Sequence, residues 1–175
     1  MRRHARLALL LYGTALAVTL LDRASKIWAE RALQHEAPIE LIGRWVRLSY
    51  TTNSGGAFGI GESAPLLFVG ATGLVVAIIV WASRRLPSFV VAVGLGLVLG
   101  GALGNLTDRA IRGSGFRGGV VDFIDVGAWP VFNLADAAIV VGAILLASAT
   151  FGARSRGGGA ADDDPGDDPA RPASR

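Results

Sequence analysis

The chain has 175 residues, a formal net charge of +3 and no cysteine. Hydrophobic residues make up 51% of it and charged residues 18%, which is more apolar surface than a soluble domain of this length can bury. The small, dispersed positive charge argues against a nucleic-acid-binding surface. The lack of cysteine excludes disulfides, a thiol nucleophile and thiolate metal ligands. We therefore expect a membrane protein of about one domain.

Four apolar segments are candidates for membrane spans, each of which takes roughly 20 residues. With their flanks included, the predicted spans cover about residues 7–28, 65–81, 89–106 and 131–151. The first segment could instead be a cleaved signal peptide, because arginines precede a short apolar run. No small-x-small cleavage pattern directly follows Leu21, so we favour a retained span.

Basic residues are concentrated on one side of these spans. The short flanks on that side hold Arg2, Arg3, Arg6, Arg84, Arg85, Arg154 and Arg156. The two longer segments, 22–64 and 107–130, mix basic with acidic residues. By the positive-inside rule, both termini are expected in the cytoplasm and both longer segments outside it.

The segments outside the spans predict a little β structure and one disordered tail. Residues 39–50 are rich in β-branched and aromatic residues around Gly43, which is typical of short strands. The glycine-rich segment 51–61 lacks the Gly-Lys-Ser/Thr of a phosphate-binding loop. Residues 152–175 are mostly Gly, Ala, Asp and Pro and are expected to be a disordered cytoplasmic tail. The predicted fold over residues 1–151 is an all-α membrane domain with four transmembrane helices and a small extracytoplasmic β platform.

Glycines recur at a spacing of four in the third predicted span. Gly96, Gly100 and Gly104 share one helical face, and Gly101 lies beside it. Small residues on one face let two membrane helices approach closely. We interpret this face as packing within the bundle rather than as a dimer interface, and expect a monomer.

Three familiar kinds of catalytic site are disfavoured by the residues present. The only histidines, His4 and His35, fall on opposite sides of the membrane, which argues against a His-x-x-x-His zinc site and a Ser-His-Asp triad. Ser25 and Lys26 invite a Ser/Lys dyad, but adjacent helical residues point about 100° apart. Carboxylates remain as the candidate catalytic groups.

Asp136 is the one charged residue of the fourth predicted span. A charge costs about 2.5–3.5 kcal/mol at the bilayer centre and less near its edge. Asn133, three residues earlier, lies on the same helical face. The polar pair predicts a site lining water, although Asp136 could simply complement the positive end of its own helix.

An acidic partner for Asp136 is expected nearby. Asp122 and Asp125 lie in the apolar segment GGVVDFIDV, which suits a short strand or a helix extension, and Asp108 closes the preceding span. Two neighbouring carboxylates share one proton and titrate as a unit, so one acts as base and the other as acid. The spacing leaves all three candidates open.

Five short motifs occur in order across residues 22–139: DRASK, NSGGAF, GNLTDR, VVDF and FNLAD. Each motif alone is a weak indication of a family. Five of them in this order on a four-span chain are a strong one. Together they resemble the lipoprotein signal peptidases, or signal peptidase II, a family of aspartyl peptidases of the bacterial inner membrane. The connection 110–119 is longer than is usual in that family, which puts the contacts of this loop in doubt more than the catalytic pair.

The resemblance implies a role for each polar residue of these motifs. Asp122 and Asp136 would be the catalytic dyad. Substrate-positioning groups would be Asn53, Asn105, Arg109 and Asn133. Supporting polar residues would be Asp22, Lys26 and Asp108. The implied substrate is a prolipoprotein whose cysteine already carries diacylglycerol, with cleavage just before that cysteine.

The resemblance also implies which partners and cofactors to expect. Prolipoproteins and membrane lipids would be the partners, and no metal or organic cofactor is implied. A rival hypothesis is a small proton-coupled transporter with Asp136 as a relay, which requires a carboxylate near the midplane and a matching polar group opposite. Residues 65–81 offer no charge for that role. A third hypothesis, a structural assembly protein, leaves the polar cluster unexplained.

Overall fold

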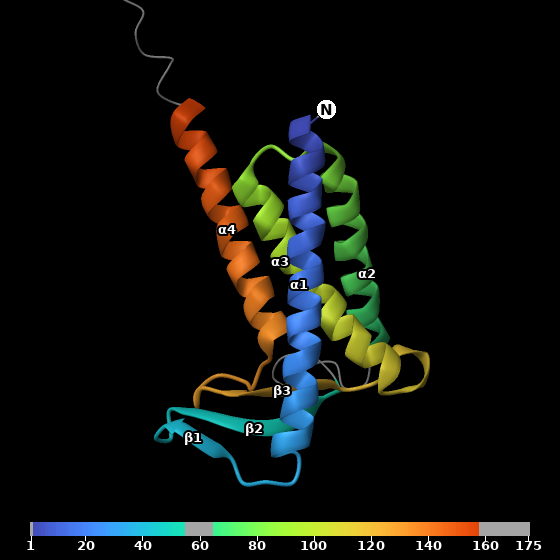
Figure 1. Cartoon of the computed structure of the whole chain (residues 1–175), viewed down its shortest axis with the longest axis vertical. Coiled ribbons are helices and arrows are strands. Elements are labelled where there is room, and N and C mark those ends of the chain that lie inside the picture. Colours follow the sequence, from blue (N-terminus) through green and yellow to red (C-terminus); the bar gives the residue numbers. More distant parts are fainter. Residues whose placement is uncertain (1, 55–64, 158–175) are drawn as a thin grey trace, which may run out of the picture.

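The computed structural model describes residues 2–54 and 65–157. The elements are α1 (Arg2–Leu33), β1 (Ile39–Ile42), β2 (Val46–Asn53), α2 (Pro65–Ala82), η2 (Ser83–Arg85), α3 (Phe89–Ile111), η3 (Ser114–Phe116), β3 (Val120–Asp125) and α4 (Leu134–Gly157). Figure 1 shows the four α-helices side by side, with the sheet lying across one end of the bundle and the N-terminus at the other. This arrangement confirms the predicted class, a helical membrane fold with a small sheet.

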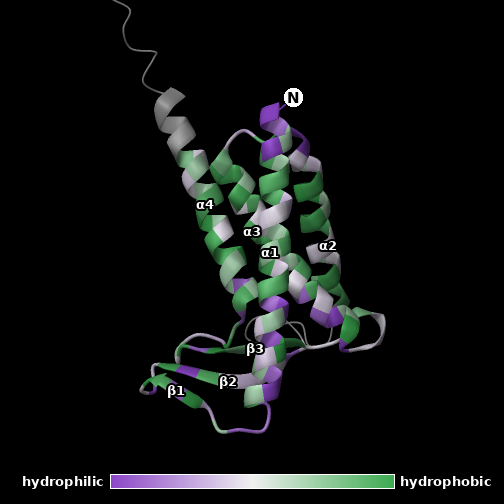
Figure 2. Cartoon of the chain, viewed as in Figure 1, coloured by the Kyte–Doolittle hydropathy of each residue, from purple (hydrophilic) through white to green (hydrophobic). Residues whose placement is uncertain are grey.

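Each of the four α-helices is long and apolar enough to cross a membrane. Figure 2 shows apolar residues over most of the helical surface, while hydrophilic residues gather at the N-terminus and where α1 meets the sheet. Exposed large side chains include Leu16, Leu67 and Ile144. A soluble bundle would instead turn a polar face outward, so the chain is a multi-pass membrane protein.

The helices extend beyond several of the predicted ends. Helix α1 covers residues 2–33 rather than about 7–28, and α3 continues to Ile111 rather than stopping near 106. The prediction followed apolar content, whereas Arg, Lys, Glu and Ala at these ends are good helix formers and carry the backbone onward. The longer α3 is important, because it places the whole GNLTDR motif on a helix.

Helix α4 differs from its prediction at both ends. It begins at Leu134 rather than 131, because Phe132 still pairs in an extended bridge with Ile124 and Asn133 supplies the N-cap. It ends at Gly157, so the first residues of the predicted tail are helical. Basic residues favour the C-terminal end of a helix, and Arg154 and Arg156 lie there in the sequence. Residues 158–175, like 55–58 of the NSGGAF motif, lie outside the described residues.

Helix α3 is the centre of the bundle, and its glycines let two helices approach it. A Cβ added at Gly96 would lie 2.7 Å from the Leu11 carbonyl oxygen, and one at Gly100 would lie 2.6 Å from that of Ala15. On another face of α3, a Cβ at Gly101 would collide with the backbone of Ala135 in α4. The glycine face thus packs inside the bundle, as the sequence analysis favoured.

Gly100→Ala is therefore expected to destabilise the protein. The new methyl group meets the backbone of α1, and overpacking of this kind costs about 1–3 kcal/mol. The matched control is Gly73→Ala in α2, where an added Cβ meets nothing within 4 Å and alanine has the better helix propensity. Thermal unfolding in detergent should move in opposite directions for the two variants. An equal shift would contradict the close approach of α1 to α3.

The sheet has the order β1-β2-β3, with both pairs antiparallel. Strands β1 and β2 fall in the β segment predicted for residues 39–50 and pair as a hairpin, in which Gly43 turns the chain with a φ of +48°. Strand β3 is the segment that the sequence left open between strand and helix. It packs beneath α1, where Val121 and Phe123 share a buried cluster with Ala29 and Leu33. The sheet is thereby fixed to the bundle next to the first turn of α4.

Candidate active site

The first turn of α4 holds Asn133 and Asp136 in a reciprocal cap. The backbone N–H of Asp136 donates to Asn133 Oδ1 at 3.0 Å, and the N–H of Asn133 donates to Asp136 Oδ2 at 3.3 Å. This is the capping-box arrangement, which satisfies two helix N–H groups at once. The carboxylate of Asp136 therefore does complement the positive end of its own helix, which was one of the two interpretations of this residue.

Strand β3 carries Asp122 to the same place. Asp122 is 3% exposed and pairs across the sheet with Thr51 of β2. The backbone N–H of Val121 donates to Asp108 Oδ2 at 3.1 Å, which ties the strand to α3. Asn53, at the end of β2, hydrogen-bonds the Asp122 carboxylate. The strand is therefore anchored on both sides of its buried carboxylate.

Two asparagines connect Asp122 with Asp136. Asn133 Nδ2 donates to Asp122 Oδ1 at 2.6 Å, and Asn105 Nδ2 donates to Asp136 Oδ1 at 2.7 Å. Asn133 Nδ2 also donates to Asn105 Oδ1 at 3.2 Å. Residues from α3, β3 and α4 thus form one network, which brings together the dyad that the resemblance implied.

The pKa of Asp122 is raised from 3.8 to about 6. Burial of the carboxyl is the largest cause, and the negative charge of Asp136 adds to it. Hydrogen bonds from Asn133 and Asn53 and the charge of Lys26 act in the opposite direction. Two carboxyl groups whose charges repel in this way ionise in separate steps, which is the property needed to provide an acid and a base together.

Asp125 and Asp108, the other two candidates, are occupied elsewhere. Asp125 Oδ1 accepts the backbone N–H of Gly127 at 2.8 Å, and its other oxygen pairs with Arg47. These contacts, the Gly127 bond first, lower the pKa of Asp125. Asp108 is fully buried and pairs with three cations: Lys26, Arg23 and Arg112. Both carboxylates thus form ion pairs, whereas Asp122 is the one that the asparagines join to Asp136.

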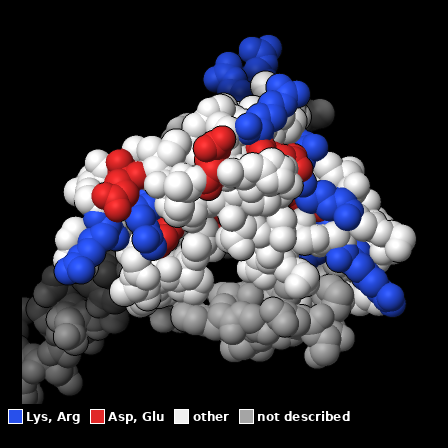
Figure 3. All heavy atoms as spheres, turned by 90° about the horizontal axis from the view of Figure 1, so that it is seen from below, with Lys and Arg blue, Asp and Glu red and all other residues white. Residues whose placement is uncertain are grey.

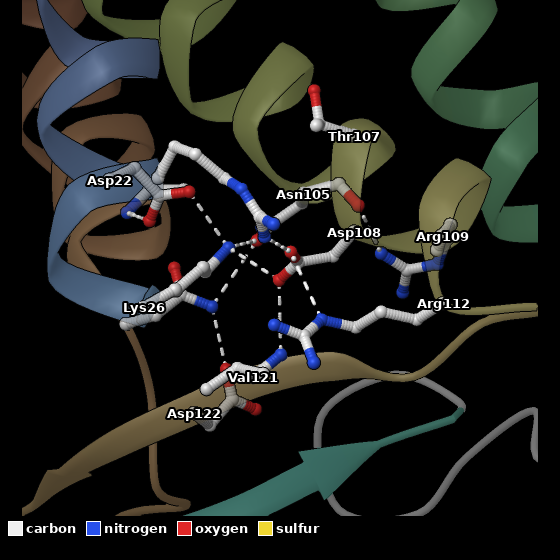
Figure 4. A network of polar contacts seen from close by, with 12 residues as sticks. Asp22, Lys26, Asn105, Thr107, Asp108, Arg109, Arg112, Val121 and Asp122 are labelled. Atoms are coloured by element: carbon white, nitrogen blue, oxygen red, sulfur yellow. Dashed lines mark hydrogen bonds and ion pairs between the residues drawn. The ribbon is translucent and has the colours of Figure 1, made fainter. Parts of the chain in front are cut away.

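Lys26 forms the centre of a buried network behind the dyad (Figure 4). Its Nζ lies 2.8 Å from Asp22 Oδ2 and 3.2 Å from Asp108 Oδ2, and it donates to Asn105 Oδ1 at 2.9 Å. Asp22 Oδ1 in turn accepts the N–H of Ala135 at 2.9 Å, at the start of α4. The three predicted supporting residues are therefore all buried, and they hold α1, α3 and α4 in register.

Two further residues of this network escaped the sequence analysis. Arg112 donates to both carboxylate oxygens of Glu30, at 2.8 and 3.0 Å, and also reaches Asp108 at 3.3 Å. Asp108 and Arg112 are four residues apart, so helical spacing would have indicated the pair if α3 had been extended far enough. The bidentate contact between Arg112 and Glu30 joins α1 to the end of α3.

Ser25 and Lys26 do not form a dyad. Ser25 Oγ donates to the carbonyl of Asp22 at 2.8 Å, whereas Lys26 Nζ is committed to Asp22, Asp108 and Asn105. Within residues 2–54 and 65–157, no group of three or more His, Cys, Asp or Glu side chains could hold a metal ion.

A pocket of about 530 Å³ opens beside the two aspartates. Its polar end is formed by Asn53, Asn105, Arg109, Asp122 and Asp136. Its other walls are apolar and come mainly from Phe68, Ala71, Val75, Val98, Ile139 and Val140. Helices α2 and α4 face each other across it with little contact between them in the described part of the chain.

The mouth of this pocket faces the region that lipid would fill. Val75 of α2 and Val140 of α4 line the pocket and are 38% and 57% exposed. Figure 3 shows the sheet end of the molecule, where basic and acidic side chains are interspersed. A substrate that fits here has an apolar part within the bilayer and a polar part at the sheet.

Arg109 is the cation at the polar end. It is 9% exposed and lines the pocket, and its Nη1 donates to the carbonyl of Asn105 at 3.4 Å. Asp136 is the third residue of α4, so the site lies at the end of the span. A proton relay through the bilayer would need it near the midplane.

Comparisons of the sequence agree with this arrangement. The family model described as signal peptidase (SPase) II matches residues 14–152. The lipoprotein signal peptidase of Streptomyces coelicolor is 46% identical over 150 residues, which are 85% of this chain and 74% of that protein. The lipoprotein signal peptidase of Mycobacterium avium is 47% identical over 146 residues, 82% and 80% of the two chains.

Comparisons of the structure give the same fold. A bacterial membrane enzyme solved by the in meso method at 2.3 Å resolution matches with a TM-score of 0.72 and 24% identity, covering 88% of this chain and 92% of that one. A second bacterial membrane enzyme, solved in the same way at 1.9 Å, matches with a TM-score of 0.67 and 28% identity over 78% and 89% of the chains. With its motifs and most of its length matched, the chain belongs to the signal peptidase II family of membrane peptidases.

Proposed function

We propose that this protein is an aspartyl endopeptidase that removes the signal peptide from diacylglyceryl-modified prolipoproteins, cutting just before the lipidated cysteine. One observation carries the proposal: Asp122 and Asp136 lie together at the polar end of an apolar pocket between membrane helices. The names of its relatives, lipoprotein signal peptidases, support the substrate class. In this proposal the acyl chains enter the apolar part of the pocket while the peptide crosses its polar end.

The two aspartates divide the work of acid and base. Asp122, with its raised pKa, holds the shared proton, while the Asp136 carboxylate accepts N–H bonds from Asn105 and Asn133. Asp136 takes a proton from a water molecule while the oxygen of that water bonds to the scissile carbonyl carbon. Asp122 gives its proton to the carbonyl oxygen, which stabilises the tetrahedral intermediate.

Collapse of the intermediate completes the reaction. The cysteine nitrogen takes the proton that Asp136 removed from water, the C–N bond breaks, and the carbonyl re-forms as the hydroxyl proton returns to Asp122. The products are a signal peptide with a new carboxyl end and a lipidated cysteine with a free amine. Asn53 and Arg109 lie at the pocket's polar end, where they are placed to hold the peptide backbone.

The dyad is proposed to face the extracytoplasmic side. Arg3 donates to the carbonyl of Pro87 at 3.3 Å, so the basic N-terminus and the turn after α2 share one end of the bundle. That end is opposite the sheet (Figure 1). Since short arginine-rich flanks stay in the cytoplasm, the sheet and both aspartates lie on the other side.

The pH dependence of cleavage follows from the raised pKa of Asp122. The singly protonated dyad is the active form, so kcat/KM should fall as pH rises through about 6, the range in which free Asp122 loses its proton. Asn53→Ala removes a hydrogen bond that lowers this pKa, so the descending limb should move to higher pH even if the maximum rate drops. If the descending limb of Asn53→Ala coincides with that of the parent, the pKa of Asp122 does not determine the pH at which activity falls.

The function is tested with the purified full chain in detergent and a synthetic prolipoprotein peptide. The peptide is offered with a diacylglyceryl cysteine and, as the control, with an unmodified one. Mass spectrometry should show cleavage of the first alone, just before the cysteine. A folded protein that leaves the lipidated peptide intact, or cuts it elsewhere, would overturn the proposal.

A further inference from the structure

Among the described residues that line the pocket, Thr72 in α2 is the one with a hydroxyl group. The other hydrogen-bonding side chains that line the described pocket come from the sheet, from the ends of α3 and α4 that meet it, or from Trp129 in the connection between β3 and α4. Thr72 instead lies in the middle of a span that carries no charge between 65 and 81. A hydroxyl that faces an apolar cavity inside a membrane has no water to bond and needs another partner.

The hydroxyl of Thr72 does not donate a hydrogen bond to a carbonyl of its own helix. Thr19, Thr107 and Thr150 each donate to the carbonyl four residues earlier, at 2.9, 2.7 and 3.0 Å, which is the usual solution for a threonine in a membrane helix. Among the described residues, no partner is found for the hydroxyl of Thr72, which lines the pocket. Its hydroxyl is therefore available to whatever fills the cavity.

The depth of Thr72 matches one part of the proposed substrate. Helices α2 and α4 both start beside the sheet and run away from it (Figure 1). Thr72 is seven residues past Pro65 and Asp136 two past Leu134, so at 1.5 Å per residue Thr72 lies about 7–8 Å farther along α2 than Asp136 does along α4. In a diacylglyceryl cysteine, the chain from the scissile carbonyl through sulfur to the first ester oxygen spans roughly 8 Å when extended, by ordinary bond lengths.

We propose that Thr72 recognises the glyceryl ester of the lipidated cysteine, with its hydroxyl donating to an ester carbonyl oxygen in the pocket. This inference rests on the proposed function and adds to it a residue that selects for the acyl linkage. The acyl chains continue along Val75, Val98 and Val140, which are apolar and cannot distinguish an ester from an ether. Thr72 is thus a specificity-determining residue that takes no part in proton transfer.

The test is Thr72→Val, which replaces the hydroxyl with a methyl group of nearly the same shape. Two substrates are compared, a prolipoprotein peptide with a dipalmitoylglyceryl cysteine and the same peptide with a dihexadecylglyceryl cysteine, whose ether links have no carbonyl oxygen. For the ester substrate, Thr72→Val should raise KM roughly three- to tenfold, the value of one net hydrogen bond, with kcat little changed. For the ether substrate, parent and variant should have the same KM.

Two further variants make the result specific. Thr72→Ser keeps the hydroxyl and should retain the parent's KM for the ester. Thr14→Val in α1 also changes a membrane threonine for which the described residues offer no partner, but Thr14 lies outside this pocket, so its kinetics should match the parent's.

The outcomes separate the inference from the function on which it rests. Suppose that the parent cleaves the ester peptide. If Thr72→Val then has an unchanged KM, or if its KM rises equally for the ester and the ether substrate, the assignment of Thr72 is wrong while the peptidase function stands. If the parent cleaves neither peptide, the proposed function itself fails.

Discussion

Asp122→Asn is expected to lower turnover by about 10²- to 10⁴-fold, the usual contribution of general acid–base catalysis, and also to stabilise the folded protein at neutral pH. Both effects have one cause. Asp122 is buried beside Asp136, so its charged form is unfavourable and its pKa rises to about 6. The amide has the same shape, carries no charge and keeps one acceptor oxygen for the hydrogen bond from Asn133, at the expense of the bond that the carboxylate accepts from Asn53.

The pH dependence of this stabilisation has a definite sign. Between its ordinary pKa of 3.8 and about 6, Asp122 is more protonated in the folded protein than in the unfolded one, so the stability of the parent falls as pH rises. The amide variant avoids that loss. Its advantage should be absent below pH 4, grow up to about pH 6 and then level off, at a size on the order of 2–3 kcal/mol. Thermal unfolding in detergent across this range measures it.

Asp136→Asn should lose turnover to a similar degree without the gain in stability. Its carboxylate accepts one bond from Asn105 on one oxygen and one from Asn133 on the other, and an amide has a single acceptor oxygen. The pKa of Asp122 should fall in this variant, because a neighbouring negative charge is gone, and infrared titration of the carboxyl group can follow it.

The matched control for both variants is Asp125→Asn, on the same strand. Asp125 pairs with Arg47 away from the pocket, so this variant should cleave at the parent's rate. Because the pKa of Asp125 is lowered in the folded protein, the parent's carboxylate stabilises it above pH 4, and this variant should lose stability there. Near-normal turnover in Asp122→Asn or Asp136→Asn would disprove the dyad.

Lys26→Met is expected to have the largest effect on stability, a loss of about 3–5 kcal/mol, as is typical when one partner of a buried ion pair is removed. Lys26 is fully buried between Asp22 and Asp108. Asp108 keeps its two arginines, but Asp22 would keep only the N–H of Ala135. Turnover should fall as well, because Lys26 also donates to Asn105 Oδ1 and so directs the Asn105 amide N–H toward Asp136.

Two comparisons separate this effect from a general loss of charge. Arg23→Gln breaks a pair with the same Asp108, but the Arg23 side chain is 33% exposed, so the cost should stay below about 1 kcal/mol. In the double variant Asp22→Asn/Lys26→Met, the orphaned carboxylate is gone and part of the stability should return. Chemical unfolding of the parent, Lys26→Met, Arg23→Gln and the double variant measures these differences. If Lys26→Met were no worse than Arg23→Gln, the buried network would not be a stabilising element.

Much of this fold follows from the chain's local patterns. Long apolar segments predict membrane helices, and the β-branched and aromatic residues around Gly43 predict short strands. Asp136 could be singled out because a charge in an apolar span needs a reason, and the structure supplies two, a helix cap and a neighbour for Asp122. The choice of Asp122 over Asp125 and Asp108 came from the family motifs, since spacing alone cannot tell which carboxylates meet cations.

The remaining features depend on contacts between distant segments. Lys26 and Asp22, to which the resemblance gave only supporting roles, are both fully buried, because α3 and α4 pack Asp108, Asn105 and the start of α4 around them. Arg112 and Glu30 were missed because the predicted third span ended near residue 106 and the first near residue 28, short of both residues. The pocket, and with it the position of Thr72, arises where α2 and α4 face each other across α3, which no pattern within one helix indicates.

The exposed mouth of the pocket between α2 and α4 has a consequence for how cleavage rates should be expressed. A substrate held in the bilayer by its acyl chains meets this opening by diffusing sideways in two dimensions. The effective substrate concentration is then a mole fraction among the surrounding lipids or detergent molecules, not an amount per litre. Added detergent should slow the reaction by surface dilution even when the bulk concentrations of enzyme and peptide stay fixed.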